Sequence, residues 1–194
     1  MASWSSIAWA SGGSLAAILA LSLSGCSAQA ALPSFGVVPD FHLTDQNSAP
    51  FSSSVLLGKV WIADFIFTNC AGPCPRMSAQ MRQVDSKLAD PQTFRFVSFS
   101  VDPARDTPPV LAKYAERYQA EPGVWFFLTG SQTELQRMSR TVFMLGDVDG
   151  SLQHSTRFVL IDKKGRIRGY YLTSEEDALP RLISDARRLA KETF

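Results

Sequence analysis

The sequence predicts an α/β domain with a central mixed sheet flanked by helices, and three observations support this prediction. Strand-like and helix-like segments alternate along most of the 194-residue chain, which is typical of a parallel-cored sheet with helices on its faces. Two strand-like segments then flank a Lys-Lys-Gly turn and indicate a closing antiparallel hairpin. An amphipathic segment ends the chain. We also expect an extra strand or hairpin around residues 35–43.

Hydrophobic periodicity places each element. The expected strands cover residues 60–67, 94–101, 124–128, 156–162 and 166–172. The first of these, VWIADFIF, is mostly apolar, as expected of a buried central strand. The expected helices begin near residues 75, 107, 131 and 174, at prolines or at Ser and Thr caps. The resulting order, β-α-β-α-β-α-β-β-α, is a thioredoxin-like pattern.

Cys70 and Cys74 lie between the first central strand and its following helix, where a thioredoxin-like fold carries its chemistry. Residues four apart face the same way on a helical turn, so we expect both sulfurs to converge. The positive end of the helix is expected to favour the thiolates and to lower their pKa values. A structural disulfide, a redox-active dithiol and a metal site all remain open. A disulfide that closes so short a loop adds little stability, so we favour the metal site.

Two histidines are present. His42 lies in an alternating segment without a nearby cysteine or carboxylate cluster, so we expect a surface strand residue. His154 precedes the strand at residues 156–162, and in a thioredoxin-like sheet this loop lies beside the cysteine loop. Thioredoxin-like oxidoreductases carry a proline there, whereas this chain has none between Pro122 and Pro180. We therefore predict that His154 completes the site.

This ligand set selects a class of metal. Two thiolates and an imidazole suit copper or zinc rather than magnesium or calcium. A structural zinc site needs a closed set of protein ligands, and only Cys70, Cys74 and His154 are candidates. Met77 and Met81 are soft donors too, but their spacing matches the buried face of a helix. We therefore expect copper with an open face, as a carrier requires.

The N-terminal residues 1–26 are predicted to be a bacterial lipoprotein signal. Residues 15–23 are apolar but shorter than the roughly 20 residues of a membrane-spanning helix. They end in LSGC, which resembles a lipobox whose Cys26 becomes the lipidated N-terminus. No positive charge precedes them, which leaves an uncleaved apolar anchor or a misassigned start codon open. We expect a linker over residues 27–38 and a domain over residues 39–194, tethered to a membrane on its periplasmic side.

The overall charge excludes one class of partner. The formal net charge is +1 and no long basic run occurs, so nothing favours nucleic-acid binding.

Three motifs together resemble the Sco/SenC family of copper chaperones for cytochrome c oxidase. FTNCAGPCP at residues 67–75 resembles the family's F-T-x-C-x-x-x-C-P loop. SVDPARDT at residues 100–107 resembles S-x-D-P-x-R-D-T, which we interpret as a turn with Asp106 or Thr107 capping the next helix. His154 resembles the family's late His before an apolar strand. The matches keep the family order.

This resemblance implies a Cu(I)/Cu(II) site at Cys70, Cys74 and His154 and a metallochaperone that helps to assemble the dinuclear copper centre of a respiratory oxidase. The implied partners are the oxidase subunit that carries this centre and a periplasmic copper donor. Some family members look like thiol-disulfide reductants, so a membrane-anchored oxidoreductase that reduces partner cysteines is the alternative. The chain carries Gly72 and Gln153 where the family often carries Asp. The loss of nearby carboxylates bears on copper affinity.

Overall fold

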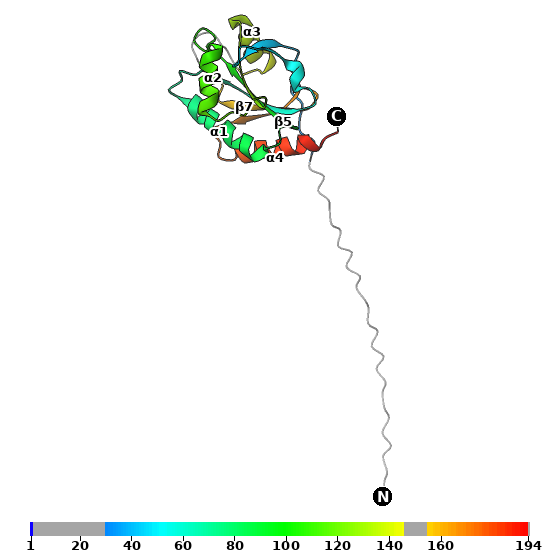
Figure 1. The fold of residues 1–194 in the computed structure, drawn as a ribbon. Helices are drawn as coiled ribbons and strands as arrows, with labels where there is room; N and C mark the ends of the chain where they lie inside the picture. The colour runs from blue at the N-terminus through cyan, green and yellow to red at the C-terminus, as the bar shows by residue number, and fades with distance from the viewer. Residues whose placement is uncertain (2–29, 146–154, 194) are drawn as a thin grey trace. The chain divides into compact units, whose positions relative to one another are not determined.

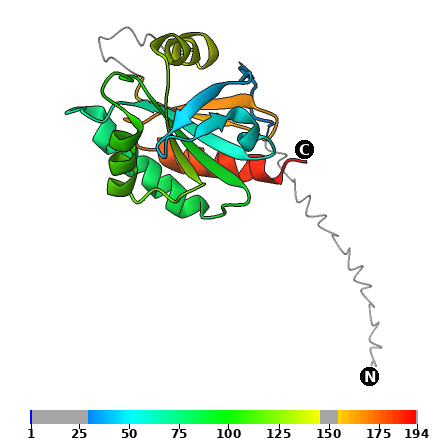
Figure 2. The same ribbon diagram turned by 45° about the horizontal axis from the view of Figure 1, so that its top comes forward.

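The computed structural model describes residues 1, 30–145 and 155–193. The chain divides into two compact units, Met1–Ala31 and Leu32–Phe194, and the fold lies in the second (Figures 1 and 2). Cys26 and His154 lie outside the described residues. Within the described residues, none of the helices combines the length and the apolar character that a membrane-spanning segment needs.

The second unit is built on an eight-stranded sheet with the order β1-β8-β7-β4-β5-β6-β2-β3. The strands are β1 Gly36–Val37, β2 His42–Asp45, β3 Pro50–Ser52, β4 Val60–Ile66, β5 Phe94–Ser100, β6 Trp125–Thr129, β7 Arg157–Ile161 and β8 Arg166–Leu172. Strands β4, β5 and β6 run parallel, whereas β7 pairs antiparallel with β4 and forms the predicted hairpin with β8. The mixed sheet confirms the predicted fold class.

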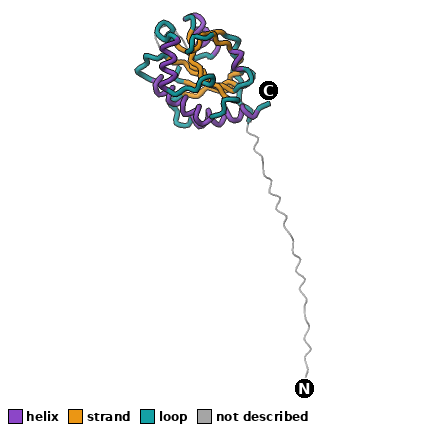
Figure 3. The backbone as a smooth tube through the Cα atoms, viewed as in Figure 1, coloured by secondary structure: helices purple, strands orange, loops and turns teal. Residues whose placement is uncertain are grey.

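Helices surround this sheet, as the tube drawing in Figure 3 shows. They are η1 Ser53–Leu56, α1 Pro73–Leu88, α2 Pro108–Arg117, α3 Gln132–Arg137, η2 Met138–Val142 and α4 Ala178–Lys191. Ser131 caps α3 as predicted, because its side chain accepts a hydrogen bond of 3.2 Å from the Glu134 backbone N–H. The helical path then widens into the π-helical turn η2, which ends at Val142.

The sheet separates two hydrophobic cores, because successive side chains of β4 point to opposite faces. Ile62 and Ile66 face one core, which helices α1, α2 and α4 cover. Trp61 and Phe65 face the other core, which η2 and the β2–β3 hairpin help to fill. Both faces of β4 are therefore buried, as its mostly apolar sequence predicts.

The N-terminal segment differs from the expectation of one strand or hairpin at residues 35–43. β1 pairs with Arg166 and Ile167 of β8, whereas β2 pairs with β6 and forms its hairpin with β3. The segment therefore supplies strands to two separate parts of the sheet. Residues 32–38, which we expected in the linker, belong to the compact unit.

The last helix begins later than predicted. We expected Ser174 to cap it, but the N-cap residue is Asp177. Thr173 is buried, and its backbone N–H and its hydroxyl both bond to the Thr156 carbonyl, at 2.9 and 2.8 Å. This attachment fixes the chain in a turn after β8, so the helix starts only after that turn.

Candidate metal centre

Cys70 and Cys74 lie at the carboxyl end of β4, in the connection to α1. We call residues 67–74 the cysteine loop. Cys70 precedes the helix, whereas Cys74 is its second residue, because α1 already begins at Pro73. Proline suits this first helical turn, where its missing N–H costs no hydrogen bond. The carboxyl ends of parallel strands are where open α/β sheets place their sites.

A tight turn, rather than a shared helical face, brings the two thiols together. The Gly72 backbone N–H donates to the Cys70 Sγ at 3.4 Å, which folds the loop over the first thiol. The Cys74 thiol is hydrogen-bonded with Cys70. Convergence is confirmed, but the predicted cause is wrong, because Cys70 is not helical. No disulfide joins these two cysteines of the described part of the chain.

The two thiols differ in exposure, and the pKa of the buried one is raised. Cys74 is fully buried, whereas Cys70 is partly exposed. Burial raises the pKa of Cys74, its hydrogen bond with Cys70 raises it further, and the Phe67 backbone N–H lowers it. The prediction of a lowered pKa is therefore wrong for Cys74, because desolvation of its thiolate outweighs the helix dipole.

A buried carboxyl group lies on the same face of the sheet as Cys74. Asp64 of β4 is fully buried, and its carboxylate oxygens have no hydrogen-bond partner among the described residues. Burial raises the pKa of Asp64 from 3.8 to about 7, against a smaller lowering by the Ser98 hydroxyl on β5. The Asp64 charge also raises the pKa of Cys74. An ionised Asp64 therefore favours the neutral form of the Cys74 thiol.

A second buried carboxylate braces the cysteine loop. Asp106 accepts hydrogen bonds from the Thr68 hydroxyl at 2.6 Å and the Thr68 backbone N–H at 3.2 Å, and from the Ser100 hydroxyl at 2.6 Å. Thr107 is the N-cap residue of α2, but neither Asp106 nor Thr107 makes the predicted side-chain cap. The Asp106 carboxylate instead contacts the cysteine loop at Thr68, two residues before Cys70.

Crowding does not require a glycine at position 72. A Cβ at this position would lie 3.8 Å from the Cys70 Sγ, an ordinary van der Waals contact. The loop therefore has room for the Asp that the family often carries here, and its absence leaves the two thiols without that carboxylate.

The other candidate ligands lie either on the surface or in the hydrophobic core. His42 is exposed on β2, as predicted. Met77 and Met81 lie on the buried face of α1 and are fully buried in the core, as predicted. Within the described residues, no group of three or more His, Cys, Asp or Glu side chains is placed to hold a metal ion. The predicted third ligand, His154, lies outside those residues.

The position of β7 bears on where a third ligand can come from. β7 runs antiparallel to β4, with Val159 opposite Ala63. Its first residue, Arg157, therefore lies at the end of the sheet that carries the cysteine loop. The chain enters β7 through residues 155 and 156, directly after His154 in sequence.

Sequence comparison then assigns the chain to a family. The SCO1/SenC family model matches residues 29–191. The chain belongs to the SCO1/SenC family. It is 35% identical over 156 residues to the SCO1 protein homolog of Bacillus subtilis (strain 168), covering 77% of this chain and 81% of that protein. It is 31% identical over 169 residues to a putative copper-binding protein of Stutzerimonas stutzeri, covering 80% and 81%.

Solved SCO1/SenC structures share the fold. A SCO1/SenC family lipoprotein from Bacillus anthracis aligns with a TM-score of 0.75 and 32% identity, covering 84% of this chain and 100% of that one. BsSco, described as a member of the Sco family of cytochrome c oxidase assembly proteins with a disulfide switch, aligns with a TM-score of 0.72, 31% identity and the same coverage. The resemblance to the Sco/SenC family and its thioredoxin-like fold is thereby confirmed.

Proposed function

We propose that this SCO1/SenC chain binds copper as cargo and delivers it during assembly of the dinuclear copper centre of a respiratory cytochrome c oxidase. The observation that carries the proposal is the pair of converging thiols, Cys70 and Cys74, in the braced cysteine loop. A sequence relative is described as a copper-binding protein and a structural relative as an oxidase assembly protein, which supports the same conclusion.

Cys70, Cys74 and His154 are the proposed ligands. Thiolate and imidazole donors match copper, and copper supplies the positive charge that makes the buried thiolate favourable. Because burial keeps the Cys74 thiol protonated, copper binding must displace that proton. Cys70, being partly exposed, is the ligand through which the ion enters and leaves. Met77 and Met81 stay in the core and take no part.

The proposed location is the outer face of a membrane, with Cys26 as the lipid attachment point after removal of residues 1–25. Its support is the LSGC sequence together with a relative that is described as a lipoprotein. The expected partners are the oxidase subunit that carries the copper centre and a copper donor in the same compartment.

The unequal exposure of the two thiols also favours a second candidate, a thiol-disulfide reductant. The partly exposed Cys70 would attack a partner disulfide, and the buried Cys74 would then resolve the mixed disulfide. Both electrons would pass to the partner, which gains two thiols, while Cys70 and Cys74 become a disulfide. This candidate uses the same cysteines without copper and without His154.

One experiment with two arms separates these candidates. The full chain, purified in neutral detergent and loaded with copper, is mixed with the soluble copper-centre domain of a respiratory oxidase whose cysteines are reduced and metal-free. Growth of the copper-centre absorption, matched by copper loss from the chain, supports delivery. In the other arm the copper-free reduced chain meets the same domain with its cysteines oxidised. Reduction there, without transfer in the first arm, would replace delivery with the reductant role.

A further inference from the structure

A hollow of about 200 Å³ lies between the cysteine loop and α2, and we call it the α2 groove. Its lining residues are Thr68, Val110, Lys113, Tyr114 and Arg117. Sites for whole small molecules usually enclose about 300–1,000 Å³, so the groove suits side chains of a docking segment better. Thr68 connects the groove to the chemistry, because it lies two residues before Cys70 and is held by Asp106.

The groove also borders the hydrophobic core that contains Cys74. Tyr114 is only 5% exposed, and its hydroxyl lies 3.0 Å from the Ser78 Oγ on α1. Tyr114 and Cys74 belong to the same buried cluster. A segment that occupies the groove would therefore lie against Thr68 of the cysteine loop and against a side chain of the core into which Cys74 packs.

Two cations of α2 line the groove. Lys113 and Arg117 lie one helical turn apart, are exposed, and make no ion pair or side-chain hydrogen bond with the described residues. Like charges at this spacing cost a helix about 0.2–0.5 kcal/mol, so helix stability does not explain the pair. Arg117 in the last turn gains from the helix dipole, but Lys113 does not.

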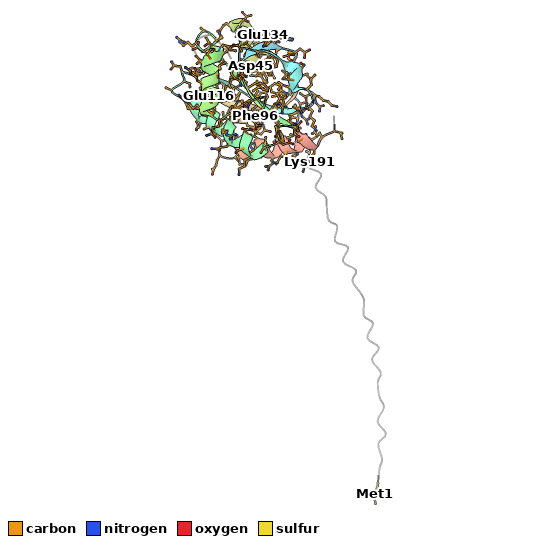
Figure 4. The ribbon with its side chains drawn as sticks, viewed as in Figure 1. Met1, Asp45, Phe96, Glu116, Glu134 and Lys191 are labelled. Atoms are coloured by element: carbon orange, nitrogen blue, oxygen red, sulfur yellow. The ribbon has the colours of Figure 1, made fainter. Side chains whose placement is uncertain are left out.

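Nearby acids leave this positive charge in place. Asp106 is buried and bonded to the cysteine loop, and Asp102 pairs with Arg105 at 2.8 Å. Glu116 lies on α2 itself, where Figure 4 labels it, and makes no ion pair within the described residues. The groove therefore presents a net positive surface to an approaching partner.

One apolar side chain completes the surface. Val110 is 37% exposed and is among the few large hydrophobic side chains left open to solvent in the described part of the chain. It lies on the same helical stripe as Lys113 and Arg117, three and seven residues before them. An apolar contact flanked by two cations matches a segment that alternates apolar and acidic side chains.

We propose that the α2 groove docks an acidic segment of the protein that receives copper, with carboxylates on Lys113 and Arg117 and an apolar side chain on Val110. The inference rests on the proposed function, since it names the surface that places the recipient beside Cys70. Such pairing steers encounter and fixes orientation more than it adds affinity, as an exchange between partners requires.

Binding of the copper-free full chain to the copper-centre domain tests the groove separately from copper delivery. The variant combines Lys113→Glu with Arg117→Glu. The matched control combines Lys87→Glu with Lys191→Glu, the same change of charge at exposed lysines in the last turns of α1 and α4. Figure 4 shows Lys191 well away from Glu116 on α2. The milder pair Lys113→Gln with Arg117→Gln covers the case in which charge reversal disturbs folding.

The groove variant is expected to weaken this binding by about tenfold or more at low salt, and the control by far less. The difference should shrink at high salt because the charges become screened. Equal binding by variant and control, or no binding by the wild-type chain, would overturn the inference. So would a groove-dependent self-association or a groove-dependent binding to anionic lipid vesicles, because each assigns another occupant. Groove-dependent binding without copper transfer would support the groove and refute delivery.

Discussion

The carboxylate of Asp106 lies 2.6 Å from the hydroxyl of Thr68, although 38 residues separate the two in the chain. A second contact, from the Thr68 backbone N–H, fixes the loop backbone as well as the side chain. Asp106 also accepts from Ser100 at the end of β5. The cysteine loop is thereby attached to the neighbouring strand and to the start of α2, which positions Cys70 before any copper arrives.

Replacing Asp106 with Asn should loosen the cysteine loop. The amide keeps one acceptor but opposes a donor to the Thr68 N–H or to the Ser100 hydroxyl, so the free energy of unfolding should fall by about 1–3 kcal/mol. Copper affinity should fall by roughly tenfold, as for other residues that orient metal ligands. Denaturant unfolding and a copper competition titration measure the two effects. Asp102→Asn is the control, since it loses only its ion pair with Arg105. Equal copper affinities for the two variants would contradict the proposal that Asp106 braces the cysteine loop.

The difference between the two thiols predicts selective labelling. In the reduced, metal-free chain, iodoacetamide should modify Cys70 at least about tenfold faster than Cys74, because the thiolate is the reactive form and Cys74 is buried with a raised pKa. Peptide mass spectrometry of a time course measures the two rates. In guanidinium the rates should become equal, which separates the effect of structure from that of local sequence. Faster labelling of Cys74 in the folded chain would refute the described loop.

Asp64 predicts a dependence of stability on pH. Its pKa is 3.8 ordinarily and about 7 in the folded chain, so between these values the folded state holds a proton that the unfolded state has released. The free energy of unfolding should therefore fall as pH rises through this window, by up to about 4 kcal/mol from this group. Asp64→Asn removes the ionisation, so it should stabilise the chain at pH 8 by more than at pH 5.

Denaturant midpoints of wild-type and Asp64→Asn chains at both pH values check this. Carboxylates with lowered pKa values, such as Asp162 and Glu134, contribute equally to both proteins and cancel in the difference. A stabilisation of the same size at pH 5 and pH 8 would mean that Asp64 does not titrate in this range.

Local patterns were sufficient for the central elements. The apolar run that begins at Val60 predicted β4 to within a residue of its observed end at Ile66. The spacing of Met77 and Met81 predicted the buried face of α1, because a helix that packs on a sheet must repeat its apolar residues every turn. The cysteine loop followed from its position between these two elements.

Features that depend on distant contacts were not predictable from such patterns. Strand β1 has only two residues, and its pairing with β8 leaves no periodic signal. The partner of Asp106 lies on another element, so the sequence suggested only a local cap. Asp64 did carry a signal, a lone acid inside an apolar strand, but its effect on Cys74 depends on how α1 packs over β4.

The most direct test of the central claim is a copper titration of the reduced full chain in parallel with His154→Ala and His42→Ala. The two variants carry the same substitution, but His42 is an exposed residue on β2 and serves as the control. The proposed site predicts a single copper per chain, a thiolate-to-copper absorption band with Cu(II), and a loss of affinity of about 100-fold or more only for His154→Ala. Equal affinity and an unchanged band for both histidine variants would contradict the site and favour the reductant role.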